Sequence, residues 1–405
     1  MSTLADTPLA TDFPSLAREG MVYMDAAATS QTPQVVIDAM ADYYEHHRGT
    51  VHRSVYALAA EATELFEGAR DRIAAFVNWP ANCTIFTKNA TESLNLVAYS
   101  WGRANVGPGD RVVTTQLEHH SNFVPWHMLC KETGAKLEMV EVDDECILKL
   151  DQLDELLATG TVKLVAVGHV SNAAGTINPV AEIVKRAHAA GAVVVVDGSQ
   201  AVPQMAVDLT EIDADFYAWT GHKLYGPTGV GVLHGRKELL DAMPPFLGGG
   251  HMISSVSIDE VRFGQLPAKF EAGTSNIAEV IGLGAAVDFV AAIGMDAIRE
   301  HEHDICAYAL ERLGELPDVT IMGPLDADKR GALVAFTLDI AHPHDIAEIL
   351  GSHEVCVRAG HHCAQPLMQR FGVAATTRAS FAVHNTRADV DALVDALNDV
   401  RRIFA

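Results

Sequence analysis

The chain has 405 residues, 49% of them hydrophobic, which is enough to bury the core of one large domain or of two to three smaller ones. Its formal net charge is -24, from 53 acidic and 29 basic residues. This argues against a basic surface of the kind that binds nucleic acids or anionic membranes. No apolar run of about 18 uncharged residues and no basic, apolar leader is found. These features predict a soluble, cytoplasmic protein with no nucleic-acid or membrane partner.

The first part of the chain predicts two helices and then alternating strands and helices. Residues 33–48 and 59–78 place apolar and charged residues at helical spacing. Strand-like and helical segments then take turns, which is typical of βαβ units around a mostly parallel sheet. The run AVVVVD predicts a strand covered by helices on both faces. Asp197 stands at its carboxyl end, where open α/β sheets bind ligands.

A second domain is predicted after the middle of the chain. A glycine-rich segment at 246–255 and FEAGTSN precede a helical run from near Ala278 to about 315. We expect this run to lead into the segments VTIMGP and GALVAFTLD, a cysteine-bearing loop and a terminal helix. The predicted division is a large domain over 16–285 and a small domain formed by 1–15 and 286–405.

Lys223 is the residue around which the other chemical groups can be arranged. It lies in WTGHKLYGPTGVG, between a possible strand end and a glycine-rich turn. Taken alone, a solvated lysine beside a turn is the simpler interpretation. Its neighbours Trp219, Leu224 and Tyr225 could instead desolvate the amine and lower its pKa towards Schiff-base chemistry. Neither GxxxxGK(S/T) nor GxGxxG is present, so a nucleotide-binding loop explains the segment less well.

Asp197 and Gln200 add a second indication of a bound cofactor. A strand-end acid most commonly caps a helix. A carboxylate paired with a pyridine nitrogen would keep that ring protonated and able to accept electrons from a carbanion. Gln200, on the same turn, could hydrogen-bond the phenolic oxygen of the ring. The pair is more informative than either residue, and with Lys223 it favours pyridoxal phosphate.

Two further strand ends carry candidate site residues. The amides of TKNATES and the Thr91 hydroxyl could bind an anion at a helix N-terminus, although an ordinary N-cap by Thr91 explains the same letters. His119 and His120 follow another strand. A histidine there can be a hydrogen-bonded core group, a metal ligand or an aromatic lid over a cofactor. The strand-end position favours a site over the core.

The cysteines and the histidine-rich stretches could serve metal binding, disulfides or nucleophilic chemistry. Six cysteines at irregular spacings, with no CxxC and no HExxH, predict reduced thiols and no intrinsic metal site. Cys363 is the predicted nucleophile, because Arg358, His361 and His362 favour a thiolate in a loop that is expected to be mobile. The other five cysteines are assigned to packing.

Six motifs in this order resemble the group II cysteine desulfurases of the SufS type, and the similarity covers nearly the whole chain. They are EHHSNFVPW, HVSNAAGTINP, DGSQAV, TGHKLYGPTGVG, FEAGTSN and RAGHHCAQPLM. The resemblance implies an α/β protein, a fold-type-I pyridoxal-phosphate-dependent transferase that works as a homodimer. A mostly parallel central sheet is implied for the large domain, and the smaller α+β domain carries the cysteine loop.

The resemblance also implies roles for individual residues. Lys223 matches the lysine that binds the cofactor, His119 the ring-stacking acid and base, and Cys363 the thiol that takes the sulfur. Asp197 and Gln200 match the contacts to the ring nitrogen and the phenolate. The other cofactor contacts that it implies are Ala90, Thr91, Asn172, Thr220, His222 and, across the dimer, Thr274. The substrate-binding residues that it implies are Asn172, Arg358 and Arg378.

The implied reaction converts L-cysteine to L-alanine and leaves a persulfide on Cys363, which passes to an acceptor protein for iron–sulfur cluster assembly. The acceptor is of the SufU or SufE type. HPHD at 342–345 favours the zinc-bearing SufU type, with His344 contacting its zinc. Selenocysteine lyase or cysteine sulfinate desulfinase activity is the alternative enzyme function. A catalytically idle partner-binding protein is the alternative of another class.

Overall fold

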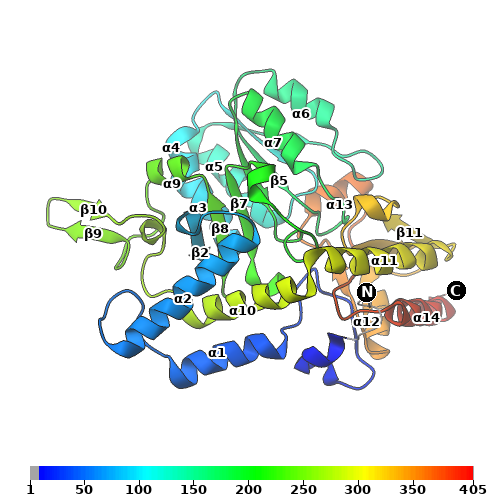
Figure 1. Cartoon of the computed structure of the whole chain (residues 1–405). Coiled ribbons are helices and arrows are strands. Elements are labelled where there is room, and N and C mark those ends of the chain that lie inside the picture. Colours follow the sequence, from blue (N-terminus) through cyan, green and yellow to red (C-terminus); the bar gives the residue numbers. More distant parts are fainter. Residues whose placement is uncertain (1–8, 405) are drawn as a thin grey trace.

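A computed structural model describes residues 9–404 of the protein. At its centre is a seven-stranded sheet in the order β2-β8-β7-β6-β5-β3-β4, with β8 antiparallel to both of its neighbours and the other pairs parallel (Figure 1). The mostly parallel sheet predicted from the sequence is confirmed. Its strands are β2 (Thr84–Thr87), β3 (Arg111–Thr115), β4 (Lys136–Val140), β5 (Val162–Gly168), β6 (Val193–Asp197), β7 (Phe216–Thr220) and β8 (Gly231–Gly235).

Both faces of this sheet are buried, because successive side chains of a strand point to opposite faces and each face has its own helices. Leu164 and Val195 belong to a core shared with α3 (Ala90–Val97) and α5 (Val124–Thr133). Val165 and Val194 belong to the opposite core, shared with α2 (Ala57–Phe76), α7 (Val180–Ala189) and α10 (Ile277–Ile293). The uninterrupted apolar run of β6 follows from this double cover.

The remaining elements of this part are short or peripheral. Helix α1 (Gln34–His46) packs on α10. The other helices are α4 (Arg103–Asn105), α6 (Leu150–Leu157), α8 (Leu209–Ile212) and α9 (Lys237–Ala242), with a π-helical turn η5 (Ala98–Gly102). The 3₁₀ helices are η2 (Leu9–Asp12), η3 (Pro14–Ala17), η4 (Ala81–Cys83), η6 (His120–Asn122), η7 (Gly221–Lys223), η8 (Ala268–Phe270) and η9 (Ala327–Lys329).

A second, four-stranded antiparallel sheet has the order β11-β12-β15-β14 and its own hydrophobic core. Its strands are β11 (Val319–Met322), β12 (Leu333–Leu338), β14 (Arg358–Gly360) and β15 (Thr376–Ser380). The associated helices are α11 (Met295–Gly314), α12 (Pro343–Ser352), α13 (Gln365–Phe371) and α14 (Arg387–Phe404). The strand β1 (Val22–Tyr23) pairs in parallel with β13 (Val355–Cys356), so a segment from the first part of the chain joins this region.

The helical run predicted from Ala278 to about 315 is two helices, and this expectation was wrong. Gly294 has φ 92°, a conformation that other residues rarely adopt, and the axes of α10 and α11 differ by 76°. The predicted domain boundary between 285 and 286 falls inside α10, whose Val287 and Val290 lie in the core of the large sheet. That division stays a prediction, and residues 1–8 of its first segment lie outside the described residues.

Across residues 9–404, no single helix is long and apolar enough to cross a bilayer; α10 and α11 meet that criterion only as a bent pair.

A hairpin of β9 (Ile253–Val256) and β10 (Val261–Phe263) projects from the body of the protein (Figure 1). Among its side chains are exposed apolar ones: Val256 by 63%, Ile258 at the tip by 103% and Phe263 by 45% of the possible area. Apolar groups gathered on a projecting hairpin are typical of a surface that another protein covers.

Candidate active site

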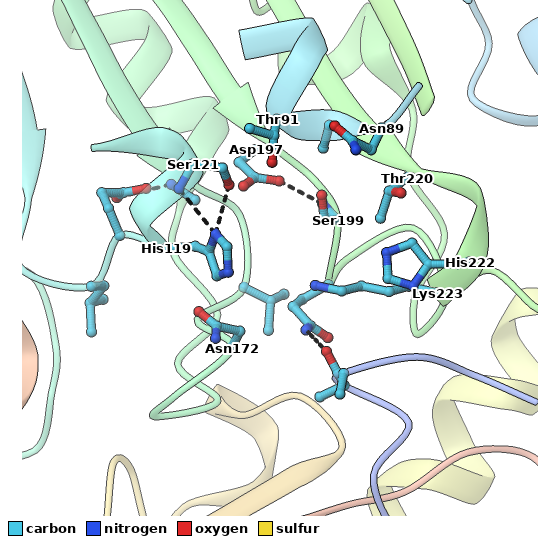
Figure 2. A pocket seen from close by; sticks show the side chains of 18 of the residues that line it. Asn89, Thr91, His119, Ser121, Asn172, Asp197, Ser199, Thr220, His222 and Lys223 are labelled. Carbon is cyan, nitrogen blue, oxygen red and sulfur yellow. Dashed lines mark hydrogen bonds between the residues drawn. The ribbon is translucent and has the colours of Figure 1, made fainter. Parts of the chain in front are cut away.

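A cavity of about 190 Å³ opens at the carboxyl ends of neighbouring strands. Gly168, Asp197 and Thr220 are the last residues of β5, β6 and β7, and all three line it. Parallel strands end at one edge of the sheet, so residues far apart in sequence meet here. Figure 2 shows Asp197 and Thr91 on one side of this space, His119 on another and Lys223 reaching in from η7.

Lys223 ends the short helix η7, directly after β7. Burial lowers the pKa of its amine to about 8, the negative charge of Asp197 opposes this shift, and Arg378 and Arg358 reinforce it. The residue is only partly exposed, and it lines the cavity. A lysine with a lowered pKa supplies the neutral amine that attacks a carbonyl carbon.

Asp197 is held in place by a tight turn. Its Oδ1 accepts a hydrogen bond from the backbone N–H of Ser199 at 3.0 Å. The intervening Gly198 is required, because a Cβ at this position would lie 2.1 Å from the ring of Tyr217. The Asp-Gly-Ser sequence thus places a buried carboxylate at the cavity wall.

The N-terminus of α3 lies at the cavity. Asn89, not Thr91, caps this helix, since its side chain accepts a hydrogen bond from the N–H of Glu92 at 2.9 Å. The N-cap interpretation of Thr91 was therefore wrong. Thr91 and Ala90 line the cavity at the positive end of the helix. The buried Thr220 hydroxyl has no hydrogen-bond partner among residues 9–404, which leaves it for a bound group.

His119 is a neutral histidine at the opposite wall. Its Nδ1 accepts a hydrogen bond from the N–H of Ser121 at 3.1 Å and lies 2.7 Å from the Ser121 hydroxyl. Burial, reinforced by the positive charge of Lys223, lowers the pKa of the ring to about 4. A neutral imidazole fixed through one nitrogen can lie against a cofactor ring and exchange a proton through the other.

Gln200 and His222 both line the cavity, but each already has a partner. The Gln200 amide donates one of its two hydrogens to the carbonyl of Ala27 at 2.7 Å, and the second can serve the predicted contact with a phenolate. His222 has Nδ1 3.2 Å from the Thr29 hydroxyl, and burial lowers its pKa to about 4.

Three of the predicted substrate residues come together at one edge of the site. Arg358 and Asn172 line the cavity. Arg378 is buried beside it, with Nη1 donating to the backbone carbonyl of Asn172 at 2.9 Å and Nη2 2.8 Å from Oδ1 of Asp25. Two guanidinium groups and an amide offer donors suited to a carboxylate.

Cys363 lies in a bonded turn and not in a free loop. Its carbonyl accepts a hydrogen bond from the N–H of His120 at 2.7 Å, and the carbonyl of His362 accepts one from Nδ2 of Asn172 at 2.6 Å. The thiol is partly exposed. The Cys363 turn, residues 361–364, is thus bonded to Asn172, which lines the cavity that also contains Lys223.

Glu118 is a cavity residue that the sequence interpretation missed. Its carboxyl is buried and accepts hydrogen bonds from Thr115, Asn122 and the N–H of Gly168. Burial raises its pKa to about 7, and the charge of Asp197 contributes to this rise. The signal was present in the letters, because Glu118 immediately precedes the two histidines at the same strand end.

Thr274 is the one predicted cofactor contact that lies away from this cavity. It lines two neighbouring surface pockets, with Phe270 in one and His52 in the other. Its predicted contact to the cofactor phosphate of another subunit stays a prediction. In the part of the chain that the structure describes, no three His, Cys, Asp or Glu side chains gather to hold a metal ion.

The groups around the cavity fit pyridoxal 5'-phosphate. The unpartnered Thr220 hydroxyl and the N-terminus of α3 suit its phosphate, the Asp197 carboxylate suits its ring nitrogen, and the Lys223 amine suits its aldehyde. The fold and the site define a pyridoxal-phosphate-dependent enzyme of fold type I.

Comparison with known proteins gives the family. The sequence profile of the aminotransferase class-V family matches residues 22–393. A probable cysteine desulfurase of Streptomyces coelicolor is 51% identical over 97% of this chain and 96% of its own length. A cysteine desulfurase of Haloferax volcanii is 48% identical over 95% and 90%. The chain therefore belongs to the class-V aminotransferase family, in the branch of the cysteine desulfurases.

Solved structures agree with this assignment. The apo cysteine desulfurase of Thermococcus onnurineus superposes with a TM-score of 0.95 at 40% identity, over 99% of both chains. The cysteine desulfurase CsdA of Escherichia coli gives a TM-score of 0.93 at 38% identity, over 100% of both chains. The expected fold is confirmed over the whole length of these relatives.

Proposed function

We propose that this protein converts L-cysteine to L-alanine and carries the sulfur as a persulfide on Cys363. The observation that carries the proposal is the placement of the Cys363 turn against the cavity that holds Lys223. A lysine cavity alone suits many reactions of this family. A partly exposed thiol on a turn bonded to the cavity wall suits sulfur transfer.

We assign the cofactor contacts as the sequence predicts them. Asp197 holds the pyridine nitrogen, Gln200 the phenolate oxygen, and His119 the face of the ring. Thr91, Thr220 and His222 bind the phosphate together with the amide of Ala90, and Thr274 reaches the phosphate of the partner subunit. Their support is the shared cavity, the unpartnered hydroxyl of Thr220 and the position of Thr274 outside it.

Arg378, Arg358 and Asn172 bind the substrate carboxylate in this proposal. When bound, the cofactor accepts the electrons that are released as bonds at the substrate α-carbon break. Lys223, whose lowered pKa makes the neutral amine more available, removes the α-proton and later returns a proton to the product. His119, held through Nδ1, can pass a proton at its Nε2.

The thiolate of Cys363 completes the reaction. It attacks the substrate sulfur, so that a sulfur–sulfur bond forms as the carbon–sulfur bond breaks and its electron pair stays with the carbon. The carbon then takes a proton. The balance is L-cysteine plus the Cys363 thiol giving L-alanine plus the Cys363 persulfide.

The direct test is release of alanine and sulfide from L-cysteine by the purified protein in the presence of a thiol reductant. Alanine should form in amounts that match the sulfide. Absence of both products from cofactor-loaded protein would contradict the proposal and favour an idle partner-binding protein.

We propose a cytoplasmic homodimer that passes its sulfur to an acceptor of the SufU or SufE type for iron–sulfur cluster assembly. The apolar β9–β10 hairpin supports dimer formation. His344, exposed at the N-terminus of α12, supports a SufU-type acceptor because it can offer a nitrogen to the zinc of that protein. Adding a zinc scaffold should increase alanine formation, and His344→Ala should remove that increase without lowering the basal rate.

Selenocysteine lyase or cysteine sulfinate desulfinase is the second candidate activity. It is favoured by the same observation that supports a lysine-centred site, since α-proton removal serves all three substrates and only the sulfur step needs the thiol. Comparing kcat/KM for the three substrates distinguishes these functions.

A further inference from the structure

We propose that His362 is a positioning residue, which fixes the Cys363 thiol relative to the carboxylate site on β15. The inference rests on the proposed function, because it concerns the step in which this thiol takes the sulfur. It extends that function to a side chain that does not line the cavity.

The Cys363 turn has an unusual backbone. His362 has φ 50° and Cys363 φ 56°, so two consecutive non-glycine residues are left-handed. Each such residue costs about 1–2 kcal/mol relative to the right-handed region. The two side chains lie in different environments, since His362 is 1% exposed whereas Cys363 is partly exposed. Such a conformation persists only where neighbouring contacts determine it.

The side chain of His362 supplies such a contact. Its Nε2 lies 2.9 Å from the hydroxyl and 3.2 Å from the carbonyl oxygen of Thr376, at the start of β15. Burial lowers the pKa of this ring to about 3, so it is neutral at working pH. The Thr376 carbonyl only accepts, which assigns the proton of the ring to Nε2.

Thr376 is also two residues from Arg378 on the same strand, and this closes a ring of contacts. Arg378 donates to the carbonyl of Asn172 at 2.9 Å, and Asn172 donates to the carbonyl of His362 at 2.6 Å. The thiol-bearing turn and the carboxylate-binding arginine are therefore tied to one strand by two routes. A substrate held by its carboxylate then meets the thiol at a set distance.

This arrangement matters for one half of the reaction. Removal of the α-proton depends on Lys223 and needs no thiol, whereas attack on sulfur needs the thiol within reach of the substrate. A displacement of about 1 Å can cost on the order of a hundredfold in rate. Loss of the His362 contact should thus slow desulfuration selectively.

The experiment compares His362→Gln, Thr376→Val and the double variant on L-cysteine and L-selenocysteine. We expect each single variant to lower kcat for cysteine by about tenfold or more, with KM and selenocysteine turnover within about twofold of wild type. The double variant should be no slower than the worse single one, because both single variants remove the contact between Nε2 of His362 and the Thr376 hydroxyl. The alkylation rate of Cys363 by iodoacetamide should also change.

His301→Gln is the matched control. His301 is half-buried on α11 and bonds the carbonyl of Asn385 at 3.0 Å without lining the cavity, so both turnover rates should be retained. Equal loss of both reactions in His362→Gln, or additive losses in the double variant, would overturn the positioning role. Failure of the wild type to form alanine from cysteine would instead overturn the proposed function.

Discussion

Arg358 and Arg378 are directly opposite each other in the antiparallel register of β14 and β15. Two cations therefore share one edge of the site, and the carboxylate of Asp25 is 2.8 Å from Nη2 of Arg378. Asp25 follows β1 and bridges to Ser380, so the N-terminal segment completes this edge. Among residues 9–404 the Arg358 guanidinium has no carboxylate partner, which suits a substrate that brings its own.

Asp25→Asn should destabilise the ligand-free protein by about 3 kcal/mol, because it leaves the buried Arg378 unpaired. Added L-alanine should recover part of this loss, since its carboxylate replaces the missing charge. Thermal unfolding with and without L-alanine measures both effects. Asp288→Asn, which breaks an exposed pair with Arg72, should cost less than about 1 kcal/mol and respond no differently to L-alanine than the wild type does.

Borohydride treatment of the cofactor-loaded protein should attach the cofactor to Lys223. Peptide mass mapping identifies the labelled lysine, and Lys223→Ala should take up no label. Lys269 is the informative comparison, because it is also buried but donates to the carbonyls of Leu240 and Asp241. A label on Lys269, or on any other lysine, would contradict the assignment.

Covalent capture of the cofactor by the apo-protein should speed up as pH rises. With a pKa of about 8, Lys223 is protonated below that pH, and only the neutral amine attacks. The rate should increase about tenfold per pH unit from pH 6 and level off above about 8. Stopped-flow absorbance measures this, with N-acetyl-lysine as the reference for ionisation of the cofactor itself.

The variant Asp197→Asn tests whether the charge of Asp197 contributes to the pKa of Lys223. The charge of Asp197 raises the pKa of Lys223, so its removal should lower that pKa and move the plateau to lower pH. An unchanged or higher midpoint would show that Asp197 does not act on the lysine.

Cys363→Ser should abolish alanine formation from L-cysteine and spare much of it from L-selenocysteine, because only the sulfur step requires the thiolate. Amino-acid analysis after incubation with each substrate gives the two rates. Cys356→Ser changes another partly exposed cysteine and should leave both rates intact. Equal loss on both substrates in Cys363→Ser would remove the assigned role.

Thr220→Val should weaken cofactor binding by on the order of tenfold while leaving the apo-protein as stable or slightly more so, because the native hydroxyl is buried without a partner in the described chain. Thr84→Val should do the reverse. Its hydroxyl is bonded to His234 at 3.0 Å, far from the cavity, so removing it should destabilise the fold without changing cofactor affinity. Melting curves and cofactor titrations of both variants provide the comparison.

The sequence allowed the central site to be predicted because strand ends are visible in the letters. Apolar runs that stop at Asp197, or at Thr220 just before Lys223, mark the edge where parallel strands meet. Thr91 and His119 were found by the same argument. Local sequence patterns and one rule of topology are enough to group the residues in these positions.

Other contributions could not be predicted because they depend on contacts between distant segments. Asp25 meets Arg378 across 353 positions, and Asn172 meets the carbonyl of His362 across 190. Asn89, and not Thr91, is the N-cap of α3 because of the dihedral angles of one turn. The break at Gly294 had a visible signal, since glycine after a long apolar run commonly ends a helix.

Because the backbone at Cys363 is left-handed, the residue that activity requires at this position differs from the residue that stability favours. Asparagine adopts that conformation more readily than cysteine does, so folding alone would favour another residue at the position where chemistry requires a thiol. An inactive Cys363→Asn chain should then melt at a higher temperature than the enzyme. Sequence libraries screened only for thermostability would be expected to lose the nucleophile first.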